Sequence, residues 1–550
     1  MVPGTVHLVD LEGTMNVQHG NGDSDVVLIP QPTNNPNDPL NWSRWRKEYH
    51  YWLLWVWGLL AAACDNWNGP VWGELKDDYH TTYTQLNISQ AMCFLFLGIG
   101  CVVLQPIAMK FGRRPVYMLG TLFDIIGNII GGLSTTNGMF FGVNVLTGMG
   151  GAPVDSLVQI TVTDIFFAHE KGTRLSLFIF TCYAGSYLGP VAAGYIDTSQ
   201  GWRWCYWYLV IFFGVFLVLQ FFTMEESTFR RPTPEAQMAV NDILTGQEPD
   251  IEAKLPEDEE KDMKVVKTNS ITGSVAQSVH GFDSQDSPPP PKTYLQHLAL
   301  WETEQSDPRP LWLIAVMPFT LFTYPAIVWA AFVYGVSIMW LSYTTTTQSE
   351  MFSVAPYNMS VASVGLTNFA SLIGGIFGMV WGGQFADWLT LKLTRRNKGV
   401  MEPEYRLWSL IVPAVVNTGG LFMYGFGAEY GVHWILPAGF GQALIAFGIG
   451  SSGAIAITYA VDCYPILASE SLVLILFGRN LIGTGFTFAI QPWLDACGIQ
   501  NTTIAVAIIC FFSNMSFLLF TWKGKEMRAW TAERYLKAAL QKDQWGGVMA

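Results

Sequence analysis

Apolar residues gather in long runs along the chain, and these runs fall into two groups of six. A helix needs about 20 mainly apolar residues to cross the hydrocarbon core of a bilayer. The expected spans of the first group are 51–71, 89–109, 115–134, 138–164, 174–196 and 203–223, and those of the second group are 311–342, 360–386, 407–427, 431–461, 471–491 and 501–522. The pattern predicts an all-α membrane protein with 12 transmembrane helices in two six-helix bundles.

The run 311–342 is longer than one span requires. Two spans joined by a turn would need about 40 residues, so the run is too short for a second crossing. Pro318 and Pro325 interrupt it, and proline breaks or kinks a helix. We therefore expect an entry segment followed by one kinked span.

Polar stretches divide the chain into five expected parts. These are a disordered cytoplasmic N-terminal tail (1–50), an N-terminal six-helix bundle (51–223), a cytoplasmic linker (224–310), a C-terminal six-helix bundle (311–522) and a cytoplasmic C-terminal tail (523–550). The linker holds 17 acidic and 8 basic residues, the sequence EDEEKD and four consecutive prolines. A segment of this composition cannot bury enough apolar area to fold alone.

The basic residues of the short loops predict the orientation in the membrane. In the short loops and next to the spans, Lys and Arg number 18 on one side and two on the other, where only Lys76 and Arg203 lie. Because cytoplasmic loops carry the excess of basic residues, both termini and the linker are expected in the cytoplasm. The glycosylation sequons at Asn87, Asn358 and Asn501 all fall in loops that this topology places outside.

Composition excludes several classes of protein. Only 13% of the residues are charged, against about 25% in a typical soluble domain, so a soluble multidomain enzyme is excluded. The net charge of −13 lies in two segments, residues 1–41 with five acids and no base and the linker with its net −9, which leaves +1 for the rest of the chain. A nearly neutral apolar body offers no nucleic-acid surface.

The sequence predicts neither a cofactor nor a metal site. The eight cysteines lie mostly within apolar runs, and the chain has no CxxC motif and no histidine cluster. It also has no Walker A sequence, which argues against transport driven directly by ATP. The expected partners are the lipid bilayer, a small-molecule substrate and protons. The protein is expected to be a monomer and not an enzyme.

Each half carries a basic cluster on the same short cytoplasmic loop. The sequence FGRR (111–114) follows the second span, and TRRNKG (394–399) follows the eighth. Two such halves suggest bundles related by an axis along the membrane normal, which rock about a site at the midplane.

This arrangement resembles the major facilitator superfamily over nearly the whole chain. The loop after the second span is similar to the superfamily motif G-x-x-x-D-R/K-x-G-R-R, with Gln105 and Met109 in place of its Gly and Asp. The resemblance implies that this loop holds one conformation closed. The motif residues are Gly112, Arg113 and Arg114 in the N-terminal half. In the C-terminal half they are Gly383, Asp387, Arg395 and Arg396. Ordinary positive-inside topology is the alternative explanation of the arginines.

Two further spans carry motifs of the same superfamily. The fifth span contains GSYLGPVAAG, with Gly185, Gly189 and Pro190, which resembles the motif of its antiporters; close helix packing is the alternative. The fourth span resembles R-x-x-Q-G-x-G-x-A, but Asn144 stands where the pattern has Arg. The family associates that Arg with proton coupling, so the usual proton route is in doubt.

Several signatures resemble one fungal branch of the superfamily. They are NPNDPLNW near the N-terminus, the stretch GQFADWLTLKLTRRNKGVMEPEYRLW (383–408), YAVDCYP (459–465), Glu470 and the pair Arg479-Asn480. That branch contains twelve-span drug:proton antiporters and relatives that import polyamines and other organic cations.

Ionisable residues inside spans are costly and commonly functional. Asp65 in the first span and Asp155 in the fourth are the best candidates for binding protons or a cationic substrate, because the family lines its cavity with these spans. Asp124 in the third span is interpreted as structural. Arg479 needs an acceptor, for which Asp462 or a backbone carbonyl would serve, and anionic substrate is the other candidate.

The chain has 22 tryptophans. Trp67, Trp329 and Trp340 fall in or at the end of the first and seventh spans, where they could form an aromatic cage for a cation. An interfacial aromatic belt or simple packing is the alternative.

The functional hypothesis is a proton-coupled secondary active transporter that exports a drug-like compound or secondary metabolite by alternating access. Proton-linked uptake of an organic cation such as a polyamine is the first alternative, and a nutrient sensor that does not transport is the second. The plasma membrane is the expected location, with the vacuolar membrane as the alternative.

Overall fold

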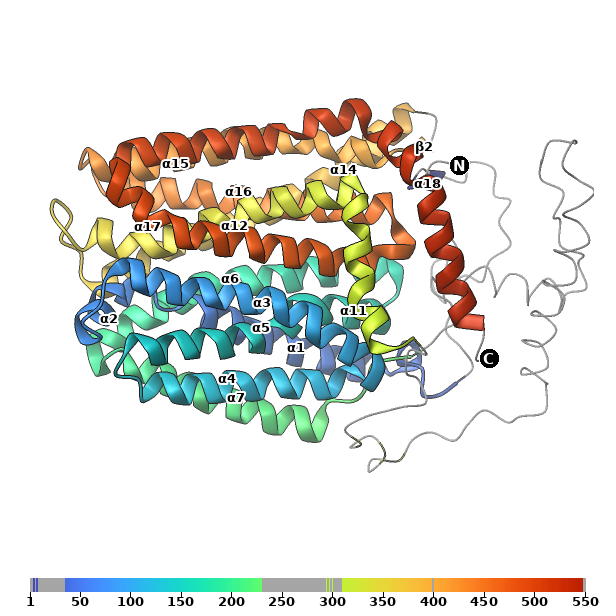
Figure 1. Cartoon of the computed structure of the whole chain (residues 1–550), viewed down its shortest axis with the longest axis horizontal. Coiled ribbons are helices and arrows are strands. Elements are labelled where there is room, and N and C mark those ends of the chain that lie inside the picture. Colours follow the sequence, from blue (N-terminus) through green and yellow to red (C-terminus); the bar gives the residue numbers. More distant parts are fainter. Residues whose placement is uncertain are drawn as a thin grey trace, which may run out of the picture.

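A computed structural model describes residues 3–4, 6–7, 35–229, 293, 296, 299, 309–397 and 400–547. The expected linker therefore lies mostly outside the described residues. Long helices run side by side along one direction, with the N-terminal half on one side and the C-terminal half on the other (Figure 1). The elements of the first half are η1 (Pro39–Asn41), α1 (Arg44–Asn66), η2 (Gly69–Val71), α2 (Trp72–Asp78), α3 (Tyr83–Phe111), α4 (Arg113–Gly132), α5 (Asn137–Ile165), α6 (Ala168–Gln200) and α7 (Arg203–Thr223).

The second half repeats the pattern of six long passages. Its elements are α11 (Leu311–Thr320), η3 (Leu321–Thr323), α12 (Pro325–Phe352), α13 (Val361–Val380), η4 (Trp381–Phe385), α14 (Ala386–Arg396), β2 (Val400–Met401), η5 (Pro403–Leu410), α15 (Ile411–Glu429), η6 (Ile435–Gly441), α16 (Gln442–Cys463), η7 (Pro465–Leu467), α17 (Ala468–Met515) and α18 (Phe517–Gly547). A short strand β1 (Val6–His7) precedes both halves.

The long helix α17 contains two membrane passages. Gly498 has φ of 73° and ψ of 167°, a conformation that interrupts the helix and favours glycine. By length and apolar composition alone, nine helical segments of the described chain qualify as spans, and the last of them, Pro465–Ala538, includes this turn. Counting both parts of α17, and adding α1 and α5, each half has six long passages. The prediction of a twelve-helix membrane protein is thus confirmed.

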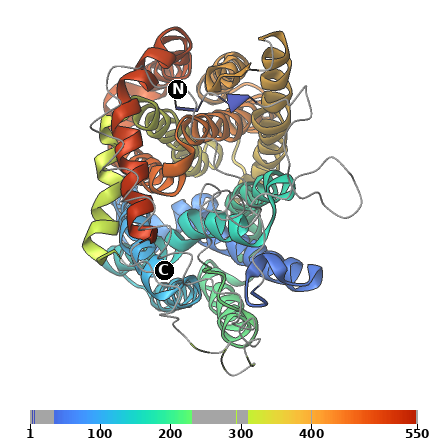
Figure 2. The ribbon, with the colours of Figure 1, turned by 90° about the vertical axis from the view of Figure 1, so that its right-hand side faces the viewer.

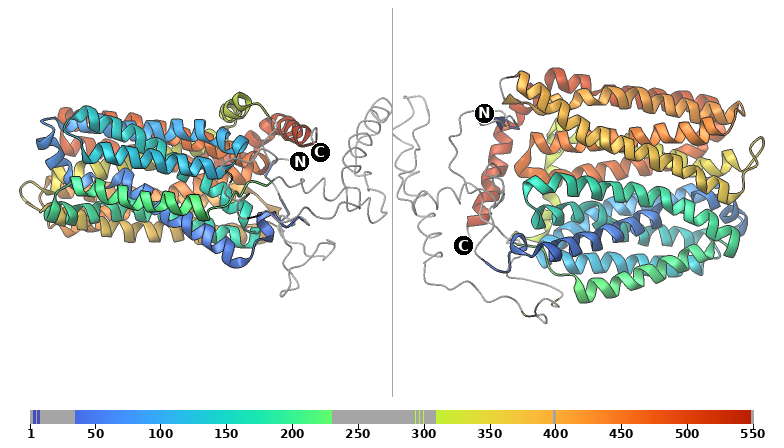
Figure 3. Two further views of the ribbon diagram at one scale, coloured as in Figure 1. Left: turned by 90° about the horizontal axis from the view of Figure 1, so that it is seen from below. Right: turned by 180° about the vertical axis from the view of Figure 1, so that it is seen from behind.

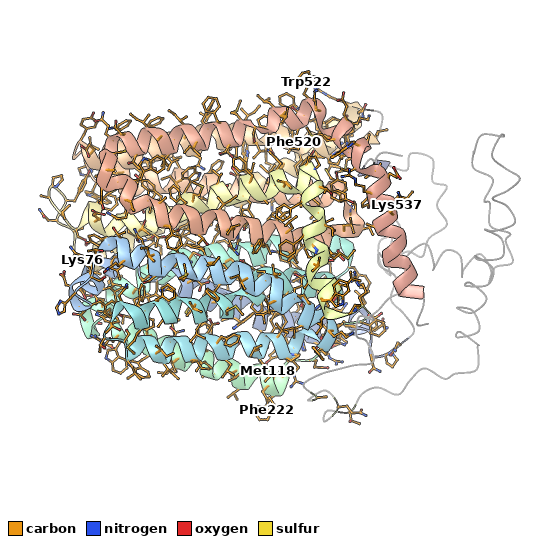
Figure 4. All side chains as sticks on the ribbon, in the orientation of Figure 1. Lys76, Met118, Phe222, Phe520, Trp522 and Lys537 are labelled. Carbon is orange, nitrogen blue, oxygen red and sulfur yellow. The ribbon has the colours of Figure 1, made fainter. Side chains whose placement is uncertain are left out.

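We call the end with the turns after α1, α4, α6, α12 and α15 the outer end, and the end with both termini the inner end, after the predicted orientation. Figure 4 shows Lys76 at the outer end and Lys537 on α18 at the inner end. Phe222 and Trp522, which are 52% and 78% exposed, point away from the bundle along its length (Figure 4). Apolar side chains on this surface suit contact with lipid.

The entry segment before the seventh span has the predicted form. The short helix α11 lies across the inner end of the long helices, and Pro325 then begins α12 (Figures 1 and 3). However, α12 continues to Phe352, ten residues beyond the expected end. The hydropathy pattern stopped early because the polar side chains of Thr346, Gln348 and Ser349 are buried against other helices rather than exposed.

Two helix pairs make the most extensive contacts between the halves: α3 packs along α17, and α6 packs along α13. Contact is close at the outer end. The Asn87 amide donates to Gln491 at 3.4 Å, and a Cβ on Gly194 of α6 would lie 2.9 Å from the carbonyl oxygen of Val361. The outer ends of the two halves therefore touch in this structure.

The described N-terminal residues depart from the expected disordered tail. Strand β1 pairs antiparallel with β2 of the C-terminal half, with Val6 opposite Met401. The Arg528 guanidinium of α18 donates to the Pro3 carbonyl at 2.5 Å and to the Glu404 carboxylate at 2.7 and 2.9 Å. Figure 2 shows the N-terminus over the C-terminal half, although α1 belongs to the other half.

Arg528→Ala is expected to destabilise this inner face by about 3 kcal/mol, because it leaves the buried Glu404 carboxylate without its counter-ion. Arg528 is 1% exposed. The measurement is the apparent melting temperature of the purified protein in detergent. Lys525→Ala is the matched control, since Lys525 pairs with Glu402 at 2.6 Å on the exposed surface, where an ion pair contributes under about 1 kcal/mol. Equal melting temperatures for the two variants would contradict the expectation.

Candidate functional site

A buried ion pair joins the two halves in the middle of the bundle. The Arg479 guanidinium of α17 donates to the Asp155 carboxylate of α5. It also donates to the Tyr334 hydroxyl of α12 at 2.8 Å, and its carbon lies 4.8 Å from the centre of the Tyr334 ring. The Asn480 side-chain oxygen accepts two more bonds, at 2.9 and 3.1 Å. Arg479 is thus held by both halves.

This arrangement satisfies a charge that the membrane interior disfavours. A buried guanidinium is stable only when paired with an anion and hydrogen-bonded, and Arg479 has one carboxylate and two neutral acceptors. The Arg479 side chain is 6% exposed, whereas that of Asp155 is 19% exposed. Asp155 is therefore the more accessible partner of this ion pair.

Asp65 lies beside the same ion pair. It is half-buried on α1, and the Cys93 thiol of α3 donates to it at 3.5 Å. Its carboxyl group is within electrostatic reach of both Asp155 and Arg479. The structure thus brings together the two acids that the sequence singled out, although their roles stay predictions.

The prediction that Asp462 accepts a bond from Arg479 was wrong. Asp462 does not contact it; the Asp462 carboxylate instead pairs with the Arg406 guanidinium at 3.3 Å. The expected fourth span (138–164) contains no Lys or Arg, because Asn144 stands where the family pattern has an arginine, so it gives Asp155 no basic neighbour of its own. Arg479 supplies that neighbour from the other half, and Asn144 is buried with its amide bonded to the Phe140 carbonyl of its own helix at 2.9 Å.

The three candidate cage tryptophans do not meet. Trp67 packs against Tyr206 with ring centres 4.9 Å apart, Trp340 packs against Phe486 at 5.9 Å, and the Trp329 indole donates to Ser516 at 2.8 Å. The three lie in separate buried clusters. A shared aromatic cage is therefore excluded in this conformation, and packing explains each ring.

The motif loop of the N-terminal half is held by acids. Gly112 has φ of 100°, which favours glycine, and the Glu226 carboxylate accepts from the backbone N–H groups of Arg113 and Arg114 at 3.0 Å each. A carboxylate is stabilising at this helix N-terminus. The Arg113 guanidinium pairs with Asp164 at the end of α5, and buried Arg114 donates to the Phe221 carbonyl at 2.5 Å.

The corresponding loop of the C-terminal half uses a different arginine. Asp387 pairs with Arg406 at 2.6 Å, and Gly383 lies in the π-helical turn η4. Arg395 and Arg396, which the motif suggested, are exposed. Because Arg406 also pairs with Asp462, it links this loop to the inner end of α16.

The glycine motif of α6 faces two different neighbours. A Cβ on Gly185 would overlap the Leu59 carbonyl of α1, and one on Gly189 would lie 2.9 Å from the Ala63 carbonyl of the same helix. Pro190 faces the other half, since its carbonyl would lie 2.8 Å from a Cβ on Gly365 of α13. The motif thus serves packing within one half and contact between the halves.

One of the three sequon asparagines is buried in the structure. Asn87 lies inside α3, is 1% exposed and bonds to Gln491, so an oligosaccharide has no access to its amide. Asn358 and Asn501 are exposed at the outer end. Their glycosylation stays a prediction.

Sequence reasoning missed Tyr334, Glu226 and Arg406. Tyr334 is a tyrosine within an apolar span, a weak signal among 21 tyrosines. Glu226 was counted with the linker, and Arg406 was counted only as a cytoplasmic charge. Among the described residues, no three His, Cys, Asp or Glu side chains are grouped so as to hold a metal ion.

Comparison with known proteins decides the family. A family model described as Major Facilitator Superfamily matches residues 54–484. The chain belongs to the major facilitator superfamily. It is therefore a multi-pass membrane protein that transports small molecules, and not an enzyme.

Fungal members of the superfamily are similar over nearly the full length. An uncharacterized MFS-type transporter of Schizosaccharomyces pombe is 32% identical over 97% of this chain and 94% of its own. Protein HOL1 of Saccharomyces cerevisiae is 29% identical over 98% of each chain. Efflux pump radE of Floropilus chiversii is 24% identical over 92% of this chain and 85% of its own.

Solved structures of superfamily members share the fold. The xylose transporter XylE from E. coli, in a partially occluded inward-open conformation, has a TM-score of 0.53 and 13% identity, and covers 87% of this chain and 99% of its own. The human organic anion transporter MFSD10 has a TM-score of 0.52 and 12% identity, and covers 86% and 99%. At these identities the likeness concerns the fold alone.

Proposed function

We propose that the protein exports a small drug-like compound or secondary metabolite in exchange for protons, by alternating access. The observation that carries the proposal is the ion pair between Asp155 and Arg479, one partner from each half. A transporter that rocks its halves must make and break contacts between them. A pair whose strength depends on one proton links that movement to proton binding.

The proposed cycle follows from the two partners. When a proton binds the Asp155 carboxylate, its attraction for Arg479 falls, and the guanidinium keeps its bonds to Tyr334 and Asn480 in its own half. The halves can then separate at this level. Loss of the proton restores the carboxylate and the pair, so one proton crosses for each full change of conformation.

Export is favoured by similar proteins whose names state that activity, among them efflux pump radE and a probable efflux pump of Aspergillus flavus. Uptake of an organic cation is the second candidate. It is favoured by the half-buried acids Asp65 and Asp155 of the N-terminal half, since carboxylates attract cations. The plasma membrane is the proposed location, with both termini in the cytoplasm.

The test is transport by purified protein in vesicles under an imposed pH gradient, with the membrane potential clamped. Ethidium is a suitable probe, because a permanent cation does not follow the gradient by itself. An acidic vesicle interior is expected to drive ethidium inward, since protons leave as it enters, and an uncoupler should abolish the accumulation. Accumulation only with an acidic exterior would overturn export in favour of proton-linked uptake. Saturable binding without accumulation in either gradient would indicate a sensor.

A further inference from the structure

A second carboxyl group lies deep in the N-terminal half, away from the ion pair. Asp124 of α4 is 1% exposed, and its Oδ2 has no hydrogen-bond partner among the described residues. Its Oδ1 lies so close to Gly150 of α5 that a Cβ there would overlap it. Gly150 belongs to the glycine motif of the fourth span, and its lack of a side chain leaves room for the Asp124 carboxyl group.

Asp65 flanks the next residue of the same helix. A Cβ on Gly151 would lie 2.9 Å from the Asp65 Oδ2, and the carboxyl groups of Asp65 and Asp124 are within electrostatic reach of each other. Consecutive glycines of α5 thus receive one acid from α1 and one from α4. The two acids Asp65 and Asp124 are thus distinct from the ion pair of Asp155 and Arg479.

The groups around Asp124 offer it no positive charge. Cys64 of α1 interacts electrostatically with both acids, and the Asn128 amide donates to the Cys64 sulfur at 3.2 Å. From α7, Tyr206 lies near Cys64. Within the part of the chain that the structure describes, Asp65 is the charged group that acts on Asp124.

A carboxylate in these surroundings would be costly. Burying an ion without a partner costs several kcal/mol, and a second carboxylate nearby raises the cost further. A neutral, protonated Asp124 avoids this cost. Whether Asp65 can also be charged depends on that proton, because the two groups repel when both are ionised.

We propose that Asp124 is a proton-binding residue of the transport cycle, which shares one dissociable proton with Asp65 across Gly150 and Gly151. The proposal rests on proton-coupled transport and adds a site to it. When the proton moves from the Asp124 carboxyl to the Asp65 carboxylate, Asp65 becomes neutral and Asp124 becomes charged. The total charge of the pair stays at −1, so the N-terminal half keeps a proton while the pair of Asp155 and Arg479 is intact.

The first test reads the proton directly. Infrared difference spectra of the purified protein, taken between acidic and alkaline pH, should contain the carbonyl stretch of a protonated carboxyl group in apolar surroundings. Asp124→Asn, which keeps the size and removes the titration, should remove one proton from the number released and diminish this band. Asp77→Asn is the matched control and should leave this band unchanged, because the Asp77 carboxyl is exposed at the outer end rather than in apolar surroundings. Unchanged spectra and proton release in Asp124→Asn would overturn the proposal.

The second test is transport. Asp124→Asn should lower ethidium accumulation driven by the pH gradient at least tenfold, with an unchanged melting temperature. If the variant is instead unstable, Asp65→Asn gives an independent reading: the band of Asp124 should persist there, but its loss should shift to lower pH, because the repelling neighbour is gone. Failure of the parent to couple transport to protons, with the band and the released proton intact, would reject the proposed function while leaving Asp124 as a proton site.

Discussion

Replacing Arg479 with alanine is expected to reduce substrate transport more than a hundredfold while the protein still inserts in the membrane. The variant leaves the Asp155 carboxylate without a counter-ion, which destabilises the state with the halves joined at this level by about 3 kcal/mol. Each 1.4 kcal/mol shifts the equilibrium between joined and separated halves about tenfold. It also removes a bond that joins α17 to α5. The measurement is the initial rate of ethidium transport in vesicles, normalised to the amount of inserted protein.

Three companion variants sharpen this experiment. Arg395→Ala is the matched control, because Arg395 is an exposed loop arginine. Arg479→Lys should not restore transport, since an ammonium cannot reproduce the fork of bonds that a guanidinium makes to Asp155, Tyr334 and Asn480. Asp155→Asn combined with Arg479→Gln should recover stability, because it removes both charges together. Parental rates in Arg479→Ala would show that the pair has no part in the cycle.

A side chain at Gly194 should hold the outer ends of the two halves apart. A Cβ there would lie 2.9 Å from the Val361 carbonyl and 3.0 Å from the Ala362 Cα, and backbone atoms cannot rotate out of the way. Gly194→Val is therefore expected to lower transport at least tenfold and to expose the outer contact surface. Gln348 reports this surface, since it is 1% exposed and lies against Gly69.

The measurement is the rate at which a membrane-impermeant thiol reagent labels the Gln348→Cys variant. This variant also carries Cys497→Ser, which removes the exposed native thiol. Labelling should rise at least tenfold when Gly194→Val is added. Gly214→Val is the matched control, because a Cβ on Gly214 meets nothing within 4 Å. Equal labelling with and without Gly194→Val would mean that the α6–α13 contact does not close the outer end.

The helices could be predicted because lipid imposes a length and a composition on each one. The rule failed at the end of α12, where Thr346, Thr347 and Gln348 are polar yet buried. Hydropathy measures the cost of facing lipid, and these side chains face other helices instead. A span that lines the contact between the halves therefore extends further than its apolar run.

The site was predicted in its members but not in its pairing. Asp65, Asp155 and Arg479 stand out because charge in a span needs a reason. Which charges meet depends on how the halves pack, and Asp155 and Arg479 are 324 residues apart in the chain. The tryptophans failed for the opposite reason: packing, lipid contact and ligand binding all favour the same large rings, so Trp67, Trp329 and Trp340 carried no information on position.

The strand pair of β1 and β2 changes what counts as one half of this protein. The first residues of the chain precede the N-terminal bundle but are hydrogen-bonded to the loop after α14 in the C-terminal bundle. The N-terminal bundle is thus attached to its neighbour at both of its chain ends, by the covalent connection 224–310 on one side and by Pro3, Val6 and His7 on the other. After a protease cuts between the bundles, this strand pair would still join the N-terminal polypeptide to the C-terminal one. A reporter fused ahead of Pro3 would sense the C-terminal bundle rather than the one that follows it in sequence.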